Sequence, residues 1–268
     1  MNVFSNEALS GHHILITGAT GGIGYETAVE AVKAGAAVTI TGRDEEKLKA
    51  LEEACMNVDS DAKVFSAPAD MNDQEARKGL VSEAAEQQGP ITGLVNSAGV
   101  IGGGPLDEIS EEDLRSVMEL NYFSTVLLTQ EVYKHMKQQS NPRGAIVNLS
   151  SLSGLRGTHS NIAYSASKFA VTGFTQSLAV EAIEHNIRVN AVCPGYVDTA
   201  MGQQAIKSKG EREGRSYEEQ LKMAEAGIPS GQLSTPGEVS RAIIFLLSDA
   251  SSNIIGESMK ISGGSVMR

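Results

Sequence analysis

Short runs of apolar residues alternate with longer amphipathic stretches along most of the chain. The apolar runs are almost continuously hydrophobic, as expected for parallel strands that are covered on both faces. They fall in the segments 12–18, 36–42, 63–70, 91–99, 144–151, 187–195 and 257–264. Helical patterns occur at about 22–34, from 44 onward, at 73–88, at 110–139, around Tyr164 and at 236–248. Strand and helix therefore alternate to the end of the sequence.

This alternation predicts an α/β fold with one doubly wound, mainly parallel sheet, right-handed crossovers and helices on both faces. A chain of 268 residues can form one large domain or two smaller ones. No break in composition and no linker rich in proline or serine divides this chain. We therefore expect a single domain over residues 1–268.

Several helix starts carry capping signals, and one segment lacks them. Ser110 followed by Asp113 resembles a capping box, and Thr235 precedes a proline at the first helical position. The segment 201–234 is polar, rich in glycine and contains only a weak helical run, SYEEQLKMAEA. A long irregular insertion in a compact domain usually has a function or is mobile. We predict a substrate lid at about residues 198–234.

Composition narrows the class of protein. The chain is 41% hydrophobic and 21% charged, with a formal net charge of −11 at pH 7. The acidic balance argues against nucleic acid as a partner, because phosphate backbones bind basic surfaces. We expect no signal peptide and no membrane association, since no apolar stretch approaches the ~20 residues that span a bilayer. Cys55 and Cys193 lie far apart, which favours a reduced, cytoplasmic protein.

A glycine-rich turn lies between the first apolar run and the first helix, in LITGATGGIGYETAVEA. Gly18, Gly22 and Gly24 would let the chain turn tightly, approach a pyrophosphate and pack the helix on the strand. The helix N-terminus would then direct free N–H groups at the phosphates. A glycine turn alone could be only a tight connection, but its position directly after the first strand favours a dinucleotide site.

The motifs, taken in order, resemble those of the short-chain dehydrogenase/reductase family, in its short single-domain branch. TGATGGIG resembles the family's loop TGxxxGIG, and NSAG at 96–99 resembles NNAG, with Ser97 replacing the second asparagine. MELNYF, NLSS, YSASK, PGYVDT and GESMKISGG resemble the remaining motifs. The match covers essentially the whole chain. Within the family, the chain is similar to 3-oxoacyl-acyl-carrier-protein reductase-like members. It implies a Rossmann-type fold with a seven-stranded sheet and an oxidoreductase that uses a nicotinamide dinucleotide.

Tyr164 and Lys168 lie four residues apart in AYSASKF, and so on one face of a helix. A free tyrosine titrates at about 10 and is a poor base at neutral pH, but a neighbouring cation lowers its pKa. We predict that Tyr164 is the general acid for ketone reduction and the general base for alcohol oxidation. Lys168 would lower the pKa of Tyr164, and the resemblance adds that it binds the nicotinamide ribose. In isolation, a tyrosine and a lysine at this spacing more often form a packing pair.

Two further side chains complete the predicted catalytic set. Ser151 lies thirteen residues before the tyrosine, the separation that the resemblance implies for the catalytic serine. Its hydroxyl can donate to the developing alkoxide, whereas Ser150 and Ser153 are interpreted as loop hydrogen-bonding residues. The resemblance assigns Asn121 to a proton relay through a water and Lys168. Without the resemblance, a helix-kinking or capping role for Asn121 is favoured.

The end of the second apolar run favours NADP(H), with NAD(H) as the alternative. NAD-preferring relatives carry an acid at the position of Gly42, and the following Arg43 can pair with a 2′-phosphate. Asp44 is interpreted as a helix N-cap. The predicted cofactor-binding residues are Gly18, Ala19, Thr20, Gly21, Gly22, Ile23, Gly24, Arg43, Asp70, Met71, Asn96, Ala98, Gly99, Tyr164, Lys168, Pro194, Gly195, Val197 and Thr199.

The resemblance also implies which part of the cofactor some of these predicted residues contact. It implies that Asp70 and Met71 flank the adenine and that Asn96 and Ala98 support the adjoining ribose. It implies that Val197 and Thr199 hold the carboxamide. Strand-end aspartate and asparagine residues also commonly form turns, so their types alone do not decide between the two roles.

The leading hypothesis is an NADP(H)-dependent oxidoreductase that interconverts a small-molecule ketone and a secondary alcohol. The alternatives are an NAD-dependent dehydrogenase of a sugar or other alcohol, a nucleotide-sugar epimerase or dehydratase, and a dinucleotide-sensing protein without catalysis. The five histidines do not form a metal site, so we expect no metal.

The helix after Lys168 is apolar on more than one face, which suggests burial against another subunit. We expect a homotetramer, with a dimer as the alternative.

Overall fold

Seven parallel strands form one sheet in this computed structural model, which describes residues 7–267. Residues 1–6, part of the N-terminal stretch considered for a signal peptide, lie outside the described range. The strand order is β3-β2-β1-β4-β5-β6-β7, which confirms the predicted doubly wound sheet. The strands are β1 (His13–Thr17), β2 (Ala37–Ile40), β3 (Val64–Ser66), β4 (Gly93–Asn96), β5 (Gly144–Leu149), β6 (Ile187–Pro194) and β7 (Ser258–Ile261).

The strand order reverses between β1 and β4, which lie side by side at the centre of the sheet. The chain runs outward from β1 to β2 and β3, then returns to β4 and continues in the other direction. The last residues of the two central strands, Thr17 and Asn96, are register partners. In such sheets, ligands bind in the crevice beyond the carboxyl ends of the strands at this reversal. The topology therefore points to this edge as the functional site.

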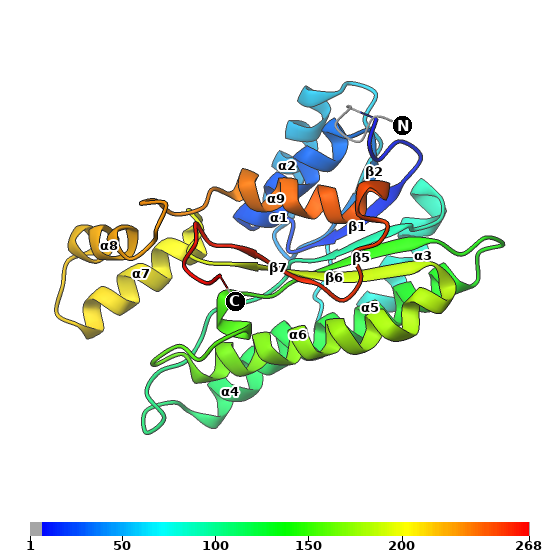
Figure 1. The fold of residues 1–268 in the computed structure, drawn as a ribbon. Coiled ribbons are helices and arrows are strands. Elements are labelled where there is room, and N and C mark those ends of the chain that lie inside the picture. The colour runs from blue at the N-terminus through cyan, green and yellow to red at the C-terminus, as the bar shows by residue number, and fades with distance from the viewer. Residues whose placement is uncertain (1–6, 268) are drawn as a thin grey trace.

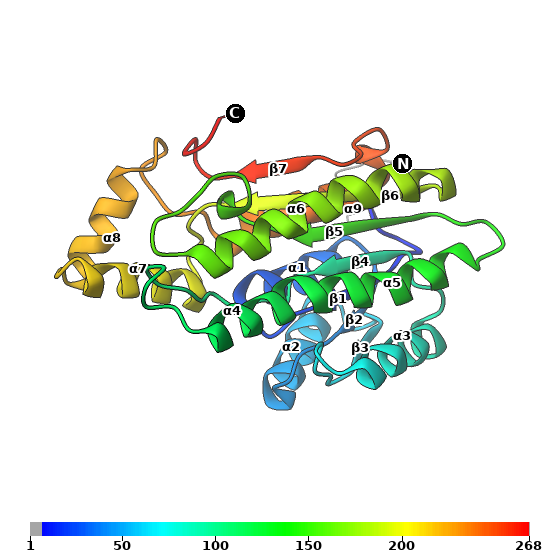
Figure 2. The same ribbon diagram turned by 90° about the horizontal axis from the view of Figure 1, so that it is seen from below.

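Helices cover both faces of the sheet (Figures 1 and 2). One face packs against α1 (Gly22–Lys33), α2 (Glu45–Val58) and α9 (Pro236–Leu247), which share one hydrophobic cluster with the strands. The other face is covered by α3 (Gln74–Gln88), α4 (Glu111–Met118), α5 (Ser124–Lys137) and α6 (Ile162–Ala182). Because the strands are covered on both sides, every residue of β1 and β6 is buried.

The capping residues expected from the sequence begin their helices. The side chain of Asp44 caps α2. Ser110 Oγ accepts a hydrogen bond from Asp113 N at 3.0 Å. Thr235 and Glu238 form a complete capping box at the start of α9. Each cap satisfies backbone N–H groups that lack partners in the first turn.

The segment predicted as a long irregular insertion is instead a helical hairpin, so the prediction of irregular structure was wrong. It contains α7 (Ala200–Arg212) and α8 (Tyr217–Ala226), and it projects beyond the carboxyl ends of the strands (Figures 1 and 2). The weak helical run SYEEQLKMAEA corresponds to α8, whereas apolar periodicity did not reveal α7, which buries few side chains, such as Ile206. Whether this hairpin is a substrate lid stays a prediction.

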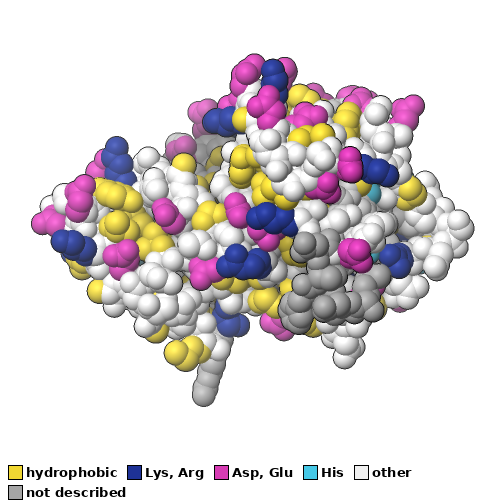
Figure 3. Space-filling model, turned by 90° about the horizontal axis from the view of Figure 1, so that it is seen from above, with side chains coloured by type: hydrophobic (Ala, Val, Ile, Leu, Met, Phe, Trp, Pro, Cys, Tyr) yellow, Lys and Arg dark blue, Asp and Glu magenta, His cyan; other side chains and the backbone are white. Residues whose placement is uncertain are grey.

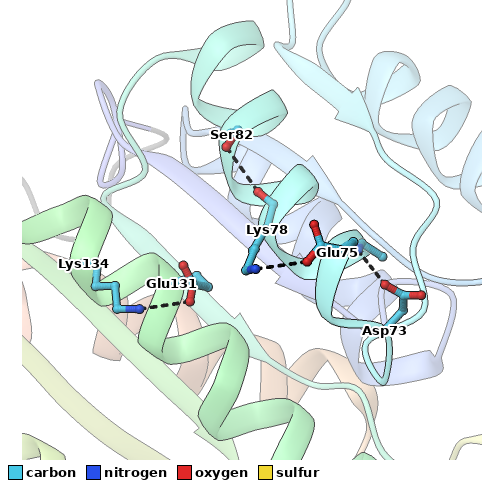
Figure 4. Close-up of polar contacts among 7 residues, drawn as sticks. Asp73, Glu75, Lys78, Ser82, Glu131 and Lys134 are labelled. Carbon is cyan, nitrogen blue, oxygen red and sulfur yellow. Dashed lines mark hydrogen bonds and ion pairs between the residues drawn. The ribbon is translucent and has the colours of Figure 1, made fainter.

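Charged side chains on the surface pair locally and do not hold the layers together. α3 and α5 lie side by side, with Lys78 bonded to Glu75 at 3.0 Å and Lys134 to Glu131 at 3.1 Å (Figure 4). Exposed pairs of this kind contribute only about 0.3–0.5 kcal/mol each. Figure 3 shows acidic and basic side chains interspersed over another face. Within residues 7–267, no helix has the length and apolar character needed to cross a membrane.

Candidate active site

The glycine loop between β1 and α1 is fixed by close approaches that a side chain would prevent. Gly18 has a φ of +62°, and a Cβ on it would lie 2.7 Å from the backbone of Ala98. A Cβ on Gly24 would lie 2.3 Å from Gly18 O, and one on Gly22 would lie 2.6 Å from Thr199 Cγ2. The loop is therefore held against the segments that follow β4 and β6.

The first turn of α1 has no side chain that bonds its backbone N–H groups. Its N-cap is Gly21, and no acidic residue lies in the turn. Free N–H groups and the partial positive charge of a helix N-terminus favour phosphate binding. With glycine at its N-cap and no acidic residue in its first turn, this helix start fits the pyrophosphate of a dinucleotide.

Tyr164 and Lys168 lie on α6 and face the same edge of the sheet as the glycine loop. Lys168 Nζ lies 5.6 Å from the centre of the Tyr164 ring and donates a hydrogen bond to Leu149 O at 2.7 Å. The lysine is only 4% exposed. The structure therefore places the Lys168 ammonium close to the Tyr164 phenol, as predicted. The hydrogen bond from Lys168 to Leu149 O joins this part of α6 to the end of β5.

Burial gives the two ionisable groups pKa values that differ from their ordinary ones. Burial raises the pKa of Tyr164, and a hydrogen bond with the side chain of Ser151 partly opposes the rise. Burial lowers the pKa of Lys168 to about 8. In the structure, burial of the phenol thus raises the pKa of Tyr164, contrary to the predicted lowering. A lysine with a pKa of about 8 can, however, give and take a proton near neutral pH.

The serines before α6 separate into two kinds. Ser151 begins a short 3₁₀ turn, and its Oγ accepts a hydrogen bond from Ser153 N at 3.1 Å. Ser150 is buried, and its Oγ donates to Lys168 O at 3.0 Å and bonds with Thr172 Oγ1 at 3.0 Å. The prediction that Ser150 is a hydrogen-bonding residue is confirmed. Sequence reasoning did not find that this bond ties β5 to α6.

Asn121 lies in a π-helical turn, Glu119–Phe123, which separates α4 from α5. Its Nδ2 donates to Val100 O at 2.9 Å and to Ser167 Oγ at 3.0 Å, and its Oδ1 accepts from Val100 N at 2.8 Å. The side chain thus links the loop after β4 to α6. A Cβ on Gly99 would lie 3.1 Å from Asn121 Oδ1 and 3.6 Å from Lys168 Nζ, so Gly99 lies between the two groups. The proton relay stays a prediction.

The residue predicted to select the cofactor lies exposed after β2. Arg43 forms no ion pair in the described part of the chain, while Asp44 is used as the cap of α2. A Cβ on Gly42 would lie 3.0 Å from Thr20 Cγ2, so the glycine loop packs directly against this strand end. The guanidinium of Arg43 is therefore available to an anion beside the glycine loop.

Other predicted cofactor residues also have structural partners. Asn96 donates to Thr129 Oγ1 at 2.9 Å and to Asn148 Oδ1 at 2.8 Å, so its amide is used inside the sheet. Thr199 Oγ1 accepts from Gly202 N at 3.1 Å and caps α7. The other residues of the set lie at or after the ends of β3, β4 and β6, at the same edge; they are Asp70, Met71, Ala98, Gly99, Pro194, Gly195 and Val197.

One residue of this region was missed by sequence reasoning. Thr17 Oγ1 accepts hydrogen bonds from Ser97 N and Ala98 N, both at 3.1 Å. It thereby fixes the chain where it leaves β4 and passes the glycine loop. A polar residue ending an otherwise apolar strand, as in HILIT, was the available signal.

A glycine loop at the strand reversal, with serine, tyrosine and lysine beside it, defines a Rossmann-type oxidoreductase that binds a nicotinamide dinucleotide. The model of the short chain dehydrogenase family matches residues 12–210, and the chain belongs to this family. The match covers β1 to β6 and most of α7. The family predicted from the motifs is thereby confirmed.

Known relatives cover nearly the whole chain. The acetoacetyl-CoA reductase of Acinetobacter sp. (strain RA3849) is 35% identical over 255 residues, which are 94% of this chain and 97% of the relative. The 3-oxoacyl-[acyl-carrier-protein] reductase FabG of Thermotoga maritima is 34% identical over 259 residues, with 97% and 99% covered. A solved actinorhodin polyketide ketoreductase with NADPH has a TM-score of 0.91 and 31% identity, with 95% and 97% covered.

Proposed function

We propose that the protein is an NADP(H)-dependent oxidoreductase that interconverts a ketone and a secondary alcohol, with Tyr164 as the general acid and base. The observation that carries this proposal is the cluster of Ser151, Tyr164 and Lys168 beside the glycine loop. The hydrogen bond between Ser151 and Tyr164 and the 5.6 Å separation of the ammonium from the phenol ring support it. The named activities of the relatives, which reduce ketoacyl or acetoacetyl groups, agree with this reaction type.

In the reducing direction, the side chains act on the carbonyl oxygen of the substrate. Ser151 donates a hydrogen bond that holds this oxygen and stabilises the charge that develops on it. Tyr164 donates its proton to the same oxygen. Lys168, with a pKa of about 8, stabilises the resulting phenolate and passes it a proton. The bound nicotinamide supplies the hydride.

NADP(H) is the proposed cofactor. Arg43 is exposed, lacks an ion-pair partner in residues 7–267 and lies next to Gly42, where no acidic side chain repels a phosphate. A guanidinium binds a phosphate through paired hydrogen bonds. The ketoreductase of similar fold was solved with NADPH. The predicted ribose, adenine and carboxamide contacts are part of the same proposal.

The proposal also includes the surroundings of the reaction. The α7–α8 hairpin acts as the substrate lid, because it projects beyond the carboxyl ends of the strands (Figures 1 and 2). Phe169 and Val180 on α6 are 46% and 74% exposed, which supports association of subunits through this helix, as a tetramer or a dimer.

Both cysteines are free and buried, which fits the reducing cytoplasm.

The test is loss of NADPH absorbance with a panel of ketones, keto esters and acetoacetyl thioesters, repeated with NADH. We expect turnover of at least one substrate class with NADPH and a lower kcat/KM with NADH. Arg43→Ala should raise the KM for NADPH by roughly tenfold or more and leave that for NADH unchanged. Lys49→Ala, an exposed cation of α2, is the matched control. Cofactor binding without turnover of any substrate would instead identify a sensor.

A further inference from the structure

Arg77 is a buried arginine near the start of α3 that has no part in the mechanism described above. Its side chain is only 5% exposed. Its Nη1 donates a hydrogen bond to Met71 O at 2.6 Å, and its backbone N–H donates to Asp73 O at 3.2 Å. Asp73 is the N-cap of α3 (Figure 4). The guanidinium therefore reaches back from the helix to the turn that follows β3.

Stability alone does not account for the burial of this arginine. Within residues 7–267, no carboxylate lies within 4.0 Å of the Arg77 guanidinium, and Met71 O is the only acceptor of its side-chain hydrogen bonds. Burial of a charge without a counter-charge costs free energy. Arg188, the other buried arginine of this range, makes five hydrogen bonds, four of them to backbone carbonyls at and after the end of α9. Arg77, in contrast, serves a single carbonyl.

The carbonyl of Met71 depends on this hydrogen bond. Met71 is 5% exposed and packs in a hydrophobic cluster with residues of α3, α5 and the sheet. Among the described residues, only Arg77 donates a hydrogen bond to its oxygen. A buried carbonyl without a partner is costly, so loss of the guanidinium would favour rotation of this peptide group. Arg77 therefore fixes the course of the chain at Met71.

The segment that Arg77 holds borders the glycine loop. Ala69 N donates to Gly42 O at 3.0 Å, which joins the chain after β3 to the end of β2. A Cβ on Gly42 would lie 3.0 Å from Thr20 Cγ2, so this strand end packs against the glycine loop. A continuous wall thus runs from the glycine loop to Met71, and Arg77 supports its outer end.

We propose that Arg77 is a positioning residue for the adenosine half of the dinucleotide. Through Met71 O it holds Asp70 and Met71, the two residues proposed to flank the adenine, in place beside Gly42. This inference rests on the proposed function, since it concerns the cofactor of the same site. The role of Arg77 is independent of the 2′-phosphate, which is the proposed ligand of Arg43.

The test is a titration with NADPH and with NADH, followed by the fluorescence of the reduced nicotinamide. Arg77→Met removes the donor and keeps an apolar side chain of similar length. It should raise the dissociation constants of both cofactors by roughly tenfold and by the same factor within about twofold, because both contain the adenine. Arg43→Ala should weaken the binding of NADPH alone. No effect of Arg77→Met, or an effect on one cofactor only, would overturn the proposal.

Three further measurements separate positioning from a purely structural role. With saturating NADPH, kcat and the KM for the ketone should stay within about twofold of the wild type in Arg77→Met, because three strands separate β3 from β5. Arg77→Lys, which retains an N–H donor, should bind both cofactors within about threefold of the wild type. Without cofactor, the denaturation midpoint of Arg77→Met should equal or exceed that of the wild type, because a buried charge is removed together with its hydrogen bond. A lower midpoint with unchanged dissociation constants would refute the positioning role.

The matched control is Lys78→Met, because Lys78 is the next residue of α3, is exposed and pairs with Glu75 (Figure 4). Its cofactor dissociation constants should equal those of the wild type. If Arg77→Met does not fold, Arg77→Gln, whose amide is too short to reach Met71 O, should show the same tenfold rise. If the cofactor titrations follow these expectations but no ketone or thioester is reduced, the proposed function fails and the role of Arg77 stands.

Discussion

The start of helix α6 and the α7–α8 hairpin lie at the same edge of the sheet but are attached in different ways. α6 is joined to β5 by a row of buried polar contacts. Asn148 Nδ2 donates to Thr175 Oγ1 at 2.9 Å, Lys168 Nζ to Leu149 O at 2.7 Å, and Ser150 Oγ to Lys168 O at 3.0 Å. In a dry environment such bonds are costly to break. The residues proposed for catalysis are therefore carried by a rigid element.

The hairpin is attached mainly at its two ends. Ser234 N donates to Tyr196 O at 3.0 Å, and Asp198 N donates to Ser234 O at 2.9 Å, which closes a short stem. Beyond this stem, α7 and α8 pack mostly against each other, and Met201 and Met223 remain 41% and 51% exposed. Segments with few buried contacts open at low free-energy cost. The residues proposed for catalysis thus lie on the fixed element, and the proposed substrate lid is the adjustable one.

The largest expected effect is on kcat, and it compares a tyrosine of the rigid helix α6 with a tyrosine of the hairpin. Tyr164→Phe should reduce kcat by about 1000-fold, because general acid and base catalysis contributes on the order of 10²–10⁴. Cofactor affinity should stay nearly unchanged. Tyr217→Phe, at the start of α8, should change kcat by less than about threefold. Steady-state kinetics and a cofactor titration measure both. Substantial activity in Tyr164→Phe would remove the acid and base role.

A second comparison concerns stability. Asn148→Ala removes the amide that joins β4, β5 and α6 and should lower the free energy of unfolding by roughly 2–3 kcal/mol. Gln204→Ala in α7 removes an exposed amide whose hydrogen-bond partner within residues 7–267 is Ser208. This variant should change the free energy of unfolding by less than about 0.5 kcal/mol. Denaturant titrations give both values. Equal losses would mean that the hairpin and the sheet are attached with similar strength.

The sequence predicts the rigid region better than the adjustable one. The alternation of strands and helices, the glycine loop and the shared face of Tyr164 and Lys168 follow from local periodicity and spacing, which the fold preserves. The hairpin as a whole was missed because α7 has little apolar periodicity, and only the weak helical run SYEEQLKMAEA indicated α8. A capping box at Ser216 and Glu219 was present in the sequence and marks the start of α8.

Other features depend on contacts between distant residues and so leave no local pattern. The raised pKa of Tyr164 depends on burial by surrounding elements, which spacing to Lys168 does not reveal. Likewise, Asn96 binds Thr129 and Asn148, 33 and 52 positions away. The sequence did not reveal these interior partners of the Asn96 amide, and its contact with the cofactor stays a prediction.

The pH dependence of stability is expected to differ between a buried lysine of α6 and an exposed lysine of the hairpin. Burial lowers the pKa of Lys168 from 10.5 to about 8, so between these values the unfolded chain binds the proton more tightly. The wild type should therefore gain stability as pH rises from 7.5 to 9.5, relative to Lys168→Met. At 1.36 kcal/mol per pKa unit, the relative gain is roughly 2 kcal/mol. Denaturant titrations at both pH values measure it.

The matched control is Lys207→Met, an exposed lysine of α7, whose unfolding free energy should follow that of the wild type across this range. A difference between the wild type and Lys168→Met that stays constant with pH would show that Lys168 is not desolvated in solution. A loss of wild-type stability relative to Lys168→Met as pH rises would show that the lysine is held in its charged form by a partner.

The smallest effect tests whether the hairpin opens independently of the sheet. Ser216→Ala removes the capping box of α8, which costs about 1 kcal/mol and corresponds to roughly fivefold faster hydrogen exchange of α8 amides. The strands should exchange at unchanged rates, because the hairpin has its own low-energy opening. Ser82→Ala, an exposed serine within α3, should leave α8 unaffected (Figure 4). Equal acceleration of the α8 and strand amides in Ser216→Ala would mean that the hairpin unfolds only together with the sheet, and the adjustable region would lose its independence.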